Sequence, residues 1–490
     1  MHVVLTGATG FLGRALVLRL LGDGHAITAL VRDAGRARAA LGAAPAIVPL
    51  ADDAEVRRAV AGADAVVNLG GEGIMDRRWS AARKRALVAS RVDLTRRLVD
   101  AIAARGRRLP VLVSASAVGW YGDRGDDVVD EAAPAGDDFA ARLCRDWEAA
   151  AEAARPHVDR LVRARIGVWS SAPAARALAS LAPPFRVGVG GPLGGGRQWV
   201  PWIHLDDAIE ALRDAAVEPR LDGAVNLVAP TPVRNRDLAA ALGRVLHRPA
   251  VMPAPAPLLR LVLGERAGLV LGGQHVVPAA LTRAGFRFAR PALDDALREA
   301  LTGDAATCLA PVDPAVRDAS PYLRARSPAY TLTARTVIAR PLDEVFEFFA
   351  DAENLAAITP AELGFQITSP TPIAMAPGAT IDYRIQVSGV PLRWRTIIEA
   401  WEPARRFVDV QARGPYRCWW HEHRFRRDGD RTIMEDTVHY APPLGPLGRI
   451  ANRLFVADQL RAIFAQRDRA IRLRFAAPDA GDADRRAAAT

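Results

Sequence analysis

The chain has 490 residues, of which 50% are hydrophobic and 24% are charged, with a net charge of +10 and a pI near 10.3. This length predicts two or three domains, and the composition is that of a soluble globular protein. The basic residues are scattered and do not alternate with aromatic residues, so we expect no nucleic-acid partner and only a weak attraction for anionic ligands.

Neither cysteine spacing nor hydropathy indicates an exported or membrane protein. Cys144, Cys308 and Cys418 form no CxxC pair and no zinc-type spacing. The chain opens with a strand-like segment, HVVLT, in place of a signal peptide. The most apolar stretch, residues 257–273, is interrupted by charges, whereas a membrane span needs about 20 apolar residues. We expect a cytoplasmic protein without a membrane span.

Short apolar segments alternate with longer helical patterns over residues 1–302, which we assign to a first domain. This alternation is typical of a parallel sheet covered on both faces. It predicts an α/β fold of the doubly wound Rossmann type. The strands are expected at residues 2–5, 27–31, 47–50, 65–69, 111–114 and 161–168.

The sequence TGATGFLG at residues 6–13 follows a predicted strand and opens a predicted helix. In this context Gly7 permits a tight turn, Gly10 lets the backbone approach a pyrophosphate, and Gly13 lets the helix pack close to the strand. The helix N-terminus offers N–H groups and a positive dipole end to the phosphates. We expect a dinucleotide here, and the alternative is a structural turn without a ligand.

The end of the second predicted strand indicates which dinucleotide binds. NAD sites usually carry an acidic residue there, which binds the ribose hydroxyls. Here Arg32 comes first, and its guanidinium suits a 2′-phosphate. Asp33 follows it, so we expect NADP, with NAD as the alternative.

The pattern changes after residue 302. Residues 303–328 are rich in Ala, Pro and Asp and are predicted to form a linker. A second domain of the α+β class is expected at residues 329–475, where a helix beginning at Pro341 and a last helix at residues 448–475 accompany several strands. These strands are predicted at residues 330–338, 381–387, 394–401, 407–411, 418–425 and 432–440. Residues 476–490 are small and polar and are predicted to be a disordered tail.

Three further motifs of the first domain, NLGGEGIMDRRWSAARKRALVASRVDLTRRL, SASAVGWYG and PPFRVGVGGPLGGGRQWVPWIHLDDA, follow the glycine turn. Together they resemble the atypical extended short-chain dehydrogenase/reductases of the sugar-nucleotide-epimerase-like family, over essentially all of residues 1–300. The resemblance implies a Rossmann fold and a nicotinamide cofactor. By motif position it implies cofactor contacts from Thr6, Gly7, Thr9, Gly10, Phe11, Leu12, Arg32, Leu69, Gly70, Gly71, Glu72 and Ser114, with Ser116 near the nicotinamide.

The catalytic Tyr-x-x-x-Lys pair of ordinary short-chain dehydrogenases is absent. The matching stretch, DDFAARLCRDWEAAA, has Phe139 or Ala140 at the tyrosine position and contains no lysine. Lys84 is the only lysine of the chain, and Tyr121 is the only tyrosine before residue 322. A different alignment therefore cannot restore the pair.

Three residues are candidates to replace it. Tyr121 lies just past the fifth predicted strand, at the end where such sheets bind ligands, and Ser116 is close to it in sequence. Lys84 and Arg91 are two helical turns apart and share a face; we assign Lys84 to catalysis and Arg91 to the cofactor. In the alternative interpretation Tyr121 packs in a turn and Lys84 is a solvated charge.

Four residues near the sequence WIHLDD lie where extended family members contact substrate, and we assign them to substrate binding: Arg197, Gln198, Trp199 and His204. Packing is the alternative role for Trp199, and a structural histidine is the alternative for His204.

Residues 329–475 resemble the START/polyketide-cyclase-like superfamily (SRPBCC type), notably in IARPLDEVFEFFADAENLAAITP and GVPLRWRTIIEAWEPARRFVDVQARGPYRCWWHEHRF. The resemblance implies a helix-grip fold, in which a curved sheet wraps the last helix around an apolar cavity for a hydrophobic ligand. The strand aromatics either line this cavity or fill the core: Tyr383, Trp394, Trp401, Tyr416, Trp419 and Trp420.

Period-two alternation places Trp419, His421 and His423 on one face of their strand and Trp420 and Glu422 on the other. The two histidines have the spacing of metal ligands, but the sequence reveals no third ligand. We therefore expect no metal.

Three functions are compatible with these features. The first is an NADP-dependent oxidoreductase or epimerase-like enzyme with an unusual proton donor, acting on a small carbonyl, carbinol or sugar-nucleotide substrate. The second is a non-catalytic NADP(H)-binding sensor. The third is a carrier or cyclase for a lipid or polyketide-like molecule with an attached reductase. The oligomeric state is not indicated by the sequence.

Overall fold

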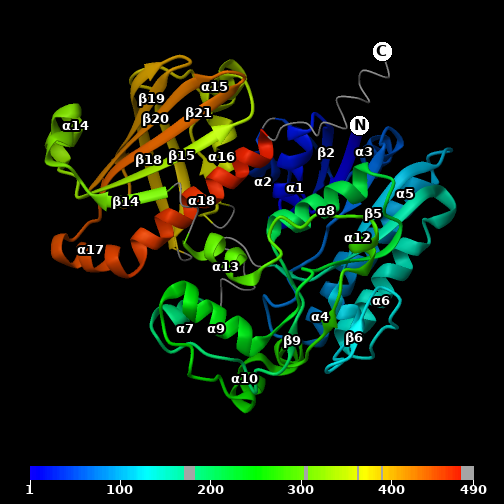
Figure 1. Cartoon of the computed structure of the whole chain (residues 1–490). Helices are drawn as coiled ribbons and strands as arrows, with labels where there is room; N and C mark the ends of the chain where they lie inside the picture. The colour runs from blue at the N-terminus through cyan, green and yellow to red at the C-terminus, as the bar shows by residue number, and fades with distance from the viewer. Residues whose placement is uncertain (43, 170–181, 303–306, 361–362, 388–389, 476–490) are drawn as a thin grey trace. The chain divides into compact units, whose positions relative to one another are not determined.

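The computed structural model describes residues 1–490 except 43, 170–181, 303–306, 361–362, 388–389 and 476–490 (Figure 1). The chain divides into two compact units. The first contains Met1–Leu16, His25–Ala34 and Pro45–Leu301, and the second contains Val17–Gly24, Gly35–Ala44 and Thr302–Thr490. The tail predicted to be disordered, residues 476–490, lies outside the described residues.

The first unit is built on a seven-stranded sheet with the order β11-β7-β5-β4-β1-β2-β3, in which every neighbouring pair is parallel. The strands are β1 His2–Thr6, β2 Ala26–Val31, β3 Ala46–Pro49, β4 Ala65–Asn68, β5 Leu109–Ala117, β7 Val158–Ile166 and β11 Gly223–Leu227. The strand order reverses between β1 and β4, which is the Rossmann topology that the sequence predicted. The prediction missed β11, a short strand at the edge of the sheet.

The helices of this half of the chain are α1 Phe11–Gly22, α2 Ala34–Leu41, α3 Asp53–Ala61, α4 Ala81–Val88, α5 Leu94–Ala103, α6 Phe139–Glu152, α7 Ala182–Arg186, α8 Leu205–Val217, α9 Asn235–Leu246, α10 Ala256–Leu263, α11 Gly268–Leu271, α12 Ala279–Arg283 and α13 Leu293–Thr302. Short strands accompany them: β6 Val128–Val129, β8 Val168–Trp169, β9 Trp199–Val200, β10 Trp202–Ile203, β12 Val233–Arg234 and β13 His275–Val276. A π-helical turn, Ala89–Asp93, joins α4 to α5. Such turns are frequent at functional sites.

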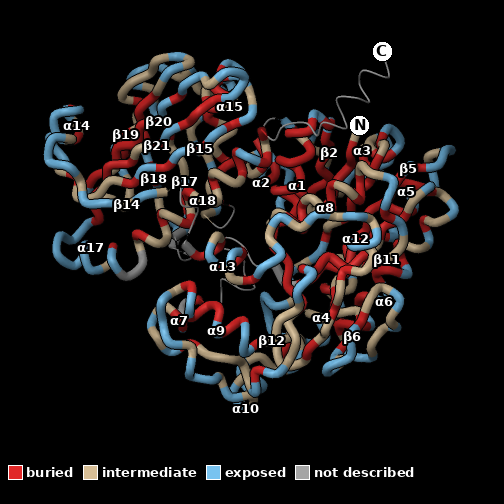
Figure 2. The backbone as a smooth tube through the Cα atoms, in the orientation of Figure 1, coloured by how far each residue is buried: buried red, intermediate tan, exposed pale blue. Residues whose placement is uncertain are grey.

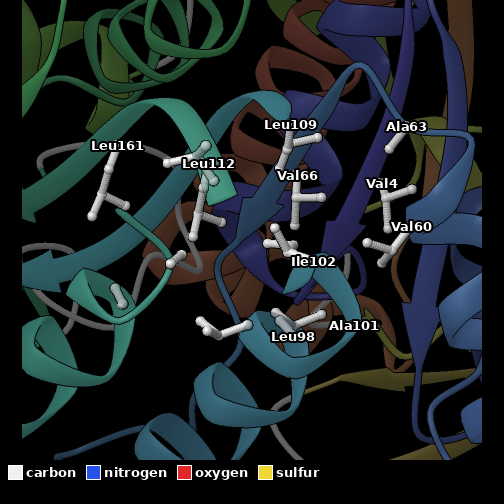
Figure 3. Close-up of a cluster of buried hydrophobic side chains, with 14 of the residues drawn as sticks. Val4, Val60, Ala63, Val66, Leu98, Ala101, Ile102, Leu109, Leu112 and Leu161 are labelled. Carbon is white, nitrogen blue, oxygen red and sulfur yellow. The ribbon is translucent and has the colours of Figure 1, made fainter. Parts of the chain in front are cut away.

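One face of the parallel sheet packs on α3 and α5 (Figure 3). Val4, Val66 and Leu112, from three neighbouring strands, meet Leu98 and Ile102 of α5, and all five side chains are at most 2% exposed. Burying a side chain of this size stabilises the fold by about 1.5–3 kcal/mol. This core holds the strands rigidly, so the loops at their carboxyl ends have defined positions.

The second unit contains an eight-stranded sheet with the order β14-β15-β21-β20-β19-β18-β17-β16, in which neighbouring strands are antiparallel. The strands are β14 Thr307–Pro311, β15 Tyr330–Ile338, β16 Gln366–Ile367, β17 Thr380–Val387, β18 Val390–Glu402, β19 Arg406–Arg413, β20 Cys418–Asp428 and β21 Arg431–Ala441. Figure 2 shows that β20 and β21 are buried along much of their length.

The helices of the second unit are α14 Pro321–Arg326, α15 Leu342–Ala350, α16 Leu355–Ile358, α17 Gly445–Ala451 and α18 Ala457–Arg474. A π-helical turn, Asn452–Val456, joins α17 to α18. Together they form the long last helix that was predicted at residues 448–475. Leu460 and Phe464 of α18 pack against Leu332, Val438 and Tyr440 of the sheet. α18 has 18 residues, and neither it nor any other helix in the described part of the chain is long and apolar enough to cross a membrane.

The predicted linker, residues 303–328, contains regular structure over its described part. β14 pairs with β15 along its whole length and forms the edge of the sheet, and α14 follows it. The sequence of this segment does not reveal these elements, because its prolines and short apolar runs give no sustained period. An edge strand needs only one hydrogen-bonded neighbour, so a weak sequence pattern is sufficient for it.

Candidate functional site

The turn after β1 has the geometry of a phosphate-binding loop. Gly7 has a φ angle of 71°, and its carbonyl accepts a hydrogen bond from Gly10 N at 2.9 Å. A β-carbon would lie 2.6 Å from Leu69 O if placed on Gly7, and 2.1 Å from Gly7 O if placed on Gly13. Only glycine fits at these two positions. Thr9 and Gly10 are exposed at the start of α1, where backbone N–H groups can meet an anion.

The side chain of Thr6, which is predicted to contact the cofactor, forms hydrogen bonds with other residues of the protein. It is 1% exposed, and its hydroxyl donates to Asn68 Oδ1 at 2.7 Å and accepts from Gly70 N at 3.2 Å. These bonds tie the carboxyl ends of β1 and β4 together where the strand order reverses. Leu12 is also buried, and Phe11 is half-buried in the first turn of α1.

The loop after β4 lies on the side chain of Arg91. Its guanidinium donates to Glu72 O at 2.8 Å, and a β-carbon on Gly71 would lie 3.1 Å from Arg91 Cζ. Desolvation by burial lowers the pKa of Arg91. Arg91 therefore supports the loop of Gly70, Gly71 and Glu72, and a contribution to cofactor binding would act through that loop.

The carboxylate of Glu72 joins the end of β2 to α4. It forms an ion pair with Arg83, and its Oε1 lies 3.8 Å from Arg32 NH1. The Arg32 side chain is 82% exposed. A guanidinium thus stands in solvent at the end of β2, where it can bind a phosphate group on a ribose. Asp33, also exposed, follows it.

Ser114 supplies a buried polar atom beside the carboxyl end of β4. It pairs in register with Asn68 across β4 and β5, and its residue is 1% exposed. Its hydroxyl has no hydrogen-bond partner among the residues that the structure describes. An unsatisfied buried hydroxyl costs about 1–3 kcal/mol, so the Ser114 hydroxyl can gain a hydrogen bond from a polar group of a ligand. Together with the glycine turn and Arg32, it fits a dinucleotide.

Lys84 lies against α6, the helix that should carry the missing tyrosine. Its Nζ is 5.0 Å from the centre of the Phe139 ring and forms an ion pair with Glu265. Arg91 also faces α6, because its Cζ lies 5.2 Å from the centre of the Trp147 ring. Lys84 and Arg91 thus face the same helix, in keeping with the shared face that their spacing predicted. The Lys84 side chain is 29% exposed and is accessible from solvent.

Ser116 and Tyr121 belong to a buried hydrogen-bond network. The Ser116 hydroxyl donates to Glu148 Oε1 at 2.7 Å, and Arg165 donates to both carboxylate oxygens of Glu148 at 2.8 and 3.0 Å. Arg165 NH1 also donates to Tyr121 OH at 3.0 Å, and that hydroxyl donates to Asn226 Oδ1 at 2.6 Å. Tyr121 is 0% exposed, and desolvation by burial raises its pKa. This geometry favours a structural role for both hydroxyls over the catalytic role expected from the sequence.

Two side chains pack on the ring of Trp199. His275 stacks on one side, with ring centres 3.9 Å apart, and the guanidinium of Arg234 lies 4.4 Å from the ring centre. The indole N–H donates to Asp126 Oδ1 at 2.9 Å. The packing interpretation of Trp199 therefore fits its surroundings better than a platform for substrate.

The other residues assigned to substrate have three different environments. Arg197 is exposed. The Gln198 side-chain amide donates to the carbonyls of Leu193 and Val270 at 3.0 and 2.9 Å. His204 is 0% exposed and caps α8, where its Nδ1 accepts from Asp206 N at 3.3 Å. Of these residues, Arg197 presents the side chain best suited to reach a substrate.

Sequence reasoning missed Glu148, Arg165 and Asn226, which hold the network of Ser116 and Tyr121. The sequence signal was weak, because β7 (VDRLVRARI) carries four charged residues and Arg165 is the only one of them that is buried. A buried charge requires a partner, but the sequence does not show which of the four charges is buried.

Comparison with known proteins places residues 1–300 in a family. The model of the NAD dependent epimerase/dehydratase family matches residues 3–227, and a domain of unknown function (DUF1731) matches residues 254–300. A chloroplastic SDR39U1 homolog of Arabidopsis thaliana, an epimerase family protein, is 43% identical over 302 residues, which are 61% of this chain and 86% of that protein.

Two further relatives agree. An epimerase family protein of Mycobacterium bovis is 41% identical over 303 residues, covering 61% of this chain and 97% of its own length. The crystal structure of human epimerase family protein SDR39U1 (isoform 2) with NADPH is 32% identical, has a TM-score of 0.54, and covers 61% of this chain and 99% of its own. Together, the two family models extend no further than residue 300. The chain belongs to the NAD-dependent epimerase/dehydratase family, among its SDR39U1-like epimerase family proteins.

Proposed function

We propose that the first unit binds NADP(H) at the turn of residues 6–13 and acts as an oxidoreductase or epimerase-like enzyme on a small carbonyl, carbinol or sugar-nucleotide substrate. The observation that carries this proposal is the exposed guanidinium of Arg32 beside a glycine turn that admits no side chain. The human relative solved with NADPH supports it. When bound, the nicotinamide would exchange a hydride with a substrate carbon.

Arg32 favours NADP(H) over NAD(H). Its nearest carboxylate, Glu72, is also paired with Arg83, and Glu72 Oε1 lies 3.8 Å from Arg32 NH1. Because this contact is long, the Arg32 guanidinium can turn toward a phosphate. A guanidinium binds phosphate through two N–H groups and keeps its charge at physiological pH. Asp33 suits the ribose hydroxyls of NAD(H), which we expect to bind more weakly.

Lys84 is the residue to which we assign proton transfer. Its ammonium group can donate a proton to an oxygen that gains negative charge as a carbonyl is reduced, and the neutral amine can take the proton back in the reverse direction. Glu265 would orient the ammonium group, and the exposed Arg197 would contact an anionic part of the substrate. Ser116 and Tyr121 would hold the end of β5 in place.

A non-catalytic NADP(H)-binding sensor is the second candidate. What favours it is the engagement of the Ser116 and Tyr121 hydroxyls with protein partners, which leaves Lys84 as the main candidate for proton transfer. A sensor would bind the cofactor as tightly but convert no substrate.

For residues 329–475 we propose a helix-grip domain that binds a hydrophobic ligand, such as a lipid or polyketide-like molecule on which the first unit would act. Support comes from α18, which packs along the sheet, and from the aromatic rings beside it. The ring centre of Trp419 lies 4.9 Å from that of Tyr416 and 6.4 Å from that of Tyr440.

The test compares NADPH and NADH binding by the whole chain and by two charge-reversal variants. Arg32→Glu should weaken NADPH by about 2 kcal/mol or more relative to NADH, because it removes a charge-assisted contact and adds repulsion. Arg57→Glu, an exposed position on α3, is the control with the same change in charge. Equal binding of both nucleotides by the wild type would refute the NADP assignment. A panel of aldehydes, ketones and sugar nucleotides with NADPH then separates enzyme from sensor by turnover.

A further inference from the structure

Four ionisable side chains gather on one face of the second unit's sheet, on β19, β20 and β21. Asp409 pairs in register with His421, and His423 pairs in register with Asp436. Period-two alternation puts both histidines on the same face of β20. The centre of the His421 ring lies 5.7 Å from that of Phe464, so this is the face that α18 covers.

The four side chains are removed from water. Those of His421, His423 and Asp436 are 4–7% exposed, and that of Asp409 is 16% exposed. Burying two carboxylates costs free energy unless cations compensate their charge. The cluster therefore requires positive charge at this point.

Three of these side chains each direct one atom into a triangle of the size that metal ligands form. Asp409 Oδ2 lies 3.4 Å from His421 Nδ1 and 3.1 Å from His423 Nε2, and the three atoms lie within 4.8 Å of one another. Bonds from a transition metal to nitrogen or oxygen are about 2.0–2.2 Å long, so neighbouring ligand atoms around one ion are about 3.0–3.5 Å apart. The two distances from Asp409 match this spacing.

The remaining nitrogen of each histidine faces Asp436. His421 Nε2 and His423 Nδ1 lie 3.0 and 2.7 Å from Asp436 Oδ1. Metal-bound histidines typically donate their second N–H to a carboxylate, which sets the tautomer and the ring orientation. Arg467 of α18 lies 3.5 Å from Asp436 Oδ1 and 3.1 Å from His423 Nδ1, and its charge offsets that of Asp436.

The hydrogen positions of the two histidines follow from their partners. A neutral imidazole carries one N–H group. Arg467 donates to His423 Nδ1 at 3.1 Å, so the His423 hydrogen lies on Nε2 and points to Asp409. A cation bound by Nε2 would take the place of this hydrogen, which would move to Nδ1 and donate to Asp436 at 2.7 Å.

We propose that Asp409, His421 and His423 bind one divalent transition-metal ion of the zinc type inside the second unit. Two imidazoles and one carboxylate suit Zn²⁺, Fe²⁺ or Co²⁺, whereas Ca²⁺ and Mg²⁺ prefer oxygen ligands alone. Three protein ligands leave a position for water or for an oxygen atom of a bound molecule. The Phe407 ring, stacked on His423 with centres 4.1 Å apart, gives the site an apolar wall. The sequence concealed the third ligand because it lies on the neighbouring strand.

The test uses the whole chain, purified without a histidine tag, stripped with a chelator and titrated with Co²⁺ and Zn²⁺. We expect one ion per chain, visible Co²⁺ absorption bands that Zn²⁺ abolishes, and a higher melting temperature with Zn²⁺. Asp409→Asn should lose affinity by more than about 100-fold, and Asp436→Asn should lose about 10–100-fold. His439→Gln is the matched control, because His439 stacks on Trp420 on the opposite face of the sheet.

Circular dichroism of each variant shows whether it is folded, and the wild-type titration stands independently of the variants. No uptake by the folded wild type would overturn the proposal. So would equal affinities of Asp409→Asn and wild type. Loss of the ion in His204→Asn alone would assign it to the other group of potential ligands, His204, Asp206 and Glu299, and would also overturn the proposal.

Discussion

The Nζ atom of Lys84 lies 5.0 Å from the centre of the Phe139 ring, so the only lysine of the chain reaches from α4 to the helix on which the family's tyrosine is missing. In the Tyr-x-x-x-Lys pair of ordinary short-chain dehydrogenases the two residues are four positions apart in the sequence. Here an ammonium group from another helix stands beside the phenylalanine. A proton donor can thus be retained although the usual pair is lost.

Replacing Lys84 should abolish most of the turnover. In Lys84→Gln we expect kcat to fall by about 100-fold or more, as is typical when a general acid is removed, with NADPH affinity unchanged. Steady-state kinetics and nucleotide titration measure the two quantities. Arg85→Gln, an exposed neighbour on α4, is the control and should behave as wild type. Full turnover by Lys84→Gln would exclude the lysine as the proton donor.

Removing the Tyr121 hydroxyl should affect stability more than catalysis. Tyr121→Phe deprives Asn226 Oδ1 of a donor at 2.6 Å and Arg165 NH1 of an acceptor at 3.0 Å. We expect the free energy of unfolding of the first unit to fall by about 1–2 kcal/mol in urea denaturation. The kcat should stay within about two-fold of wild type. A large loss of kcat at unchanged stability would restore Tyr121 as a catalytic residue.

Gly7→Ala should destroy the cofactor turn, whereas Gly106→Ala should not. The two glycines have nearly the same φ angle, 71° and 72°, so both substitutions carry the same backbone strain of about 1–2 kcal/mol. Only at Gly7 does the new β-carbon collide with a backbone atom, Leu69 O at 2.6 Å, while nothing lies within 4 Å at Gly106. Isothermal calorimetry should therefore detect NADPH binding in Gly106→Ala but not in Gly7→Ala. Similar binding by both variants would mean that the turn does not hold the cofactor.

The three cysteines should differ strongly in reactivity. Cys308 is exposed, whereas Cys144 and Cys418 are buried, and desolvation by burial raises the pKa of each of these two thiols to about 12. The thiolate is the reactive form, and a raised pKa keeps both buried thiols protonated until the pH approaches that value. A thiol reagent at about pH 8 should therefore modify one thiol in the native chain and three after denaturation. Rapid reaction in Cys308→Ser would contradict the buried positions of the other two.

Local features of the fold were predictable from the sequence. The central strands of the first unit are short continuous apolar runs, and Gly7 and Gly13 are required by backbone geometry within one turn. The strands of the second unit alternate clearly, and the helix expected to begin at Pro341 is present as α15, whose Val345, Phe346 and Phe349 are buried. Weakly patterned edge strands, β11 and β14, were missed because a single neighbour stabilises them.

Side-chain partners from distant segments were not predictable. Ser116 lies near the carboxyl end of β5 and Tyr121 follows that strand, yet their hydroxyls turn to Glu148 and Asn226 on other elements. Asp409 meets His421 only through the register of β19 and β20, and alternation within one strand does not reveal register.

The most direct test of nucleotide binding is a calorimetric titration of the full chain with NADPH and with NADH. We expect one NADPH per chain, bound at least about ten-fold more tightly than NADH, which corresponds to about 1.4 kcal/mol. The melting temperature should rise with NADPH concentration, as it does for any ligand that binds only the folded state. Absence of both binding heat and a melting shift with either nucleotide would rule out a dinucleotide site at the turn of residues 6–13.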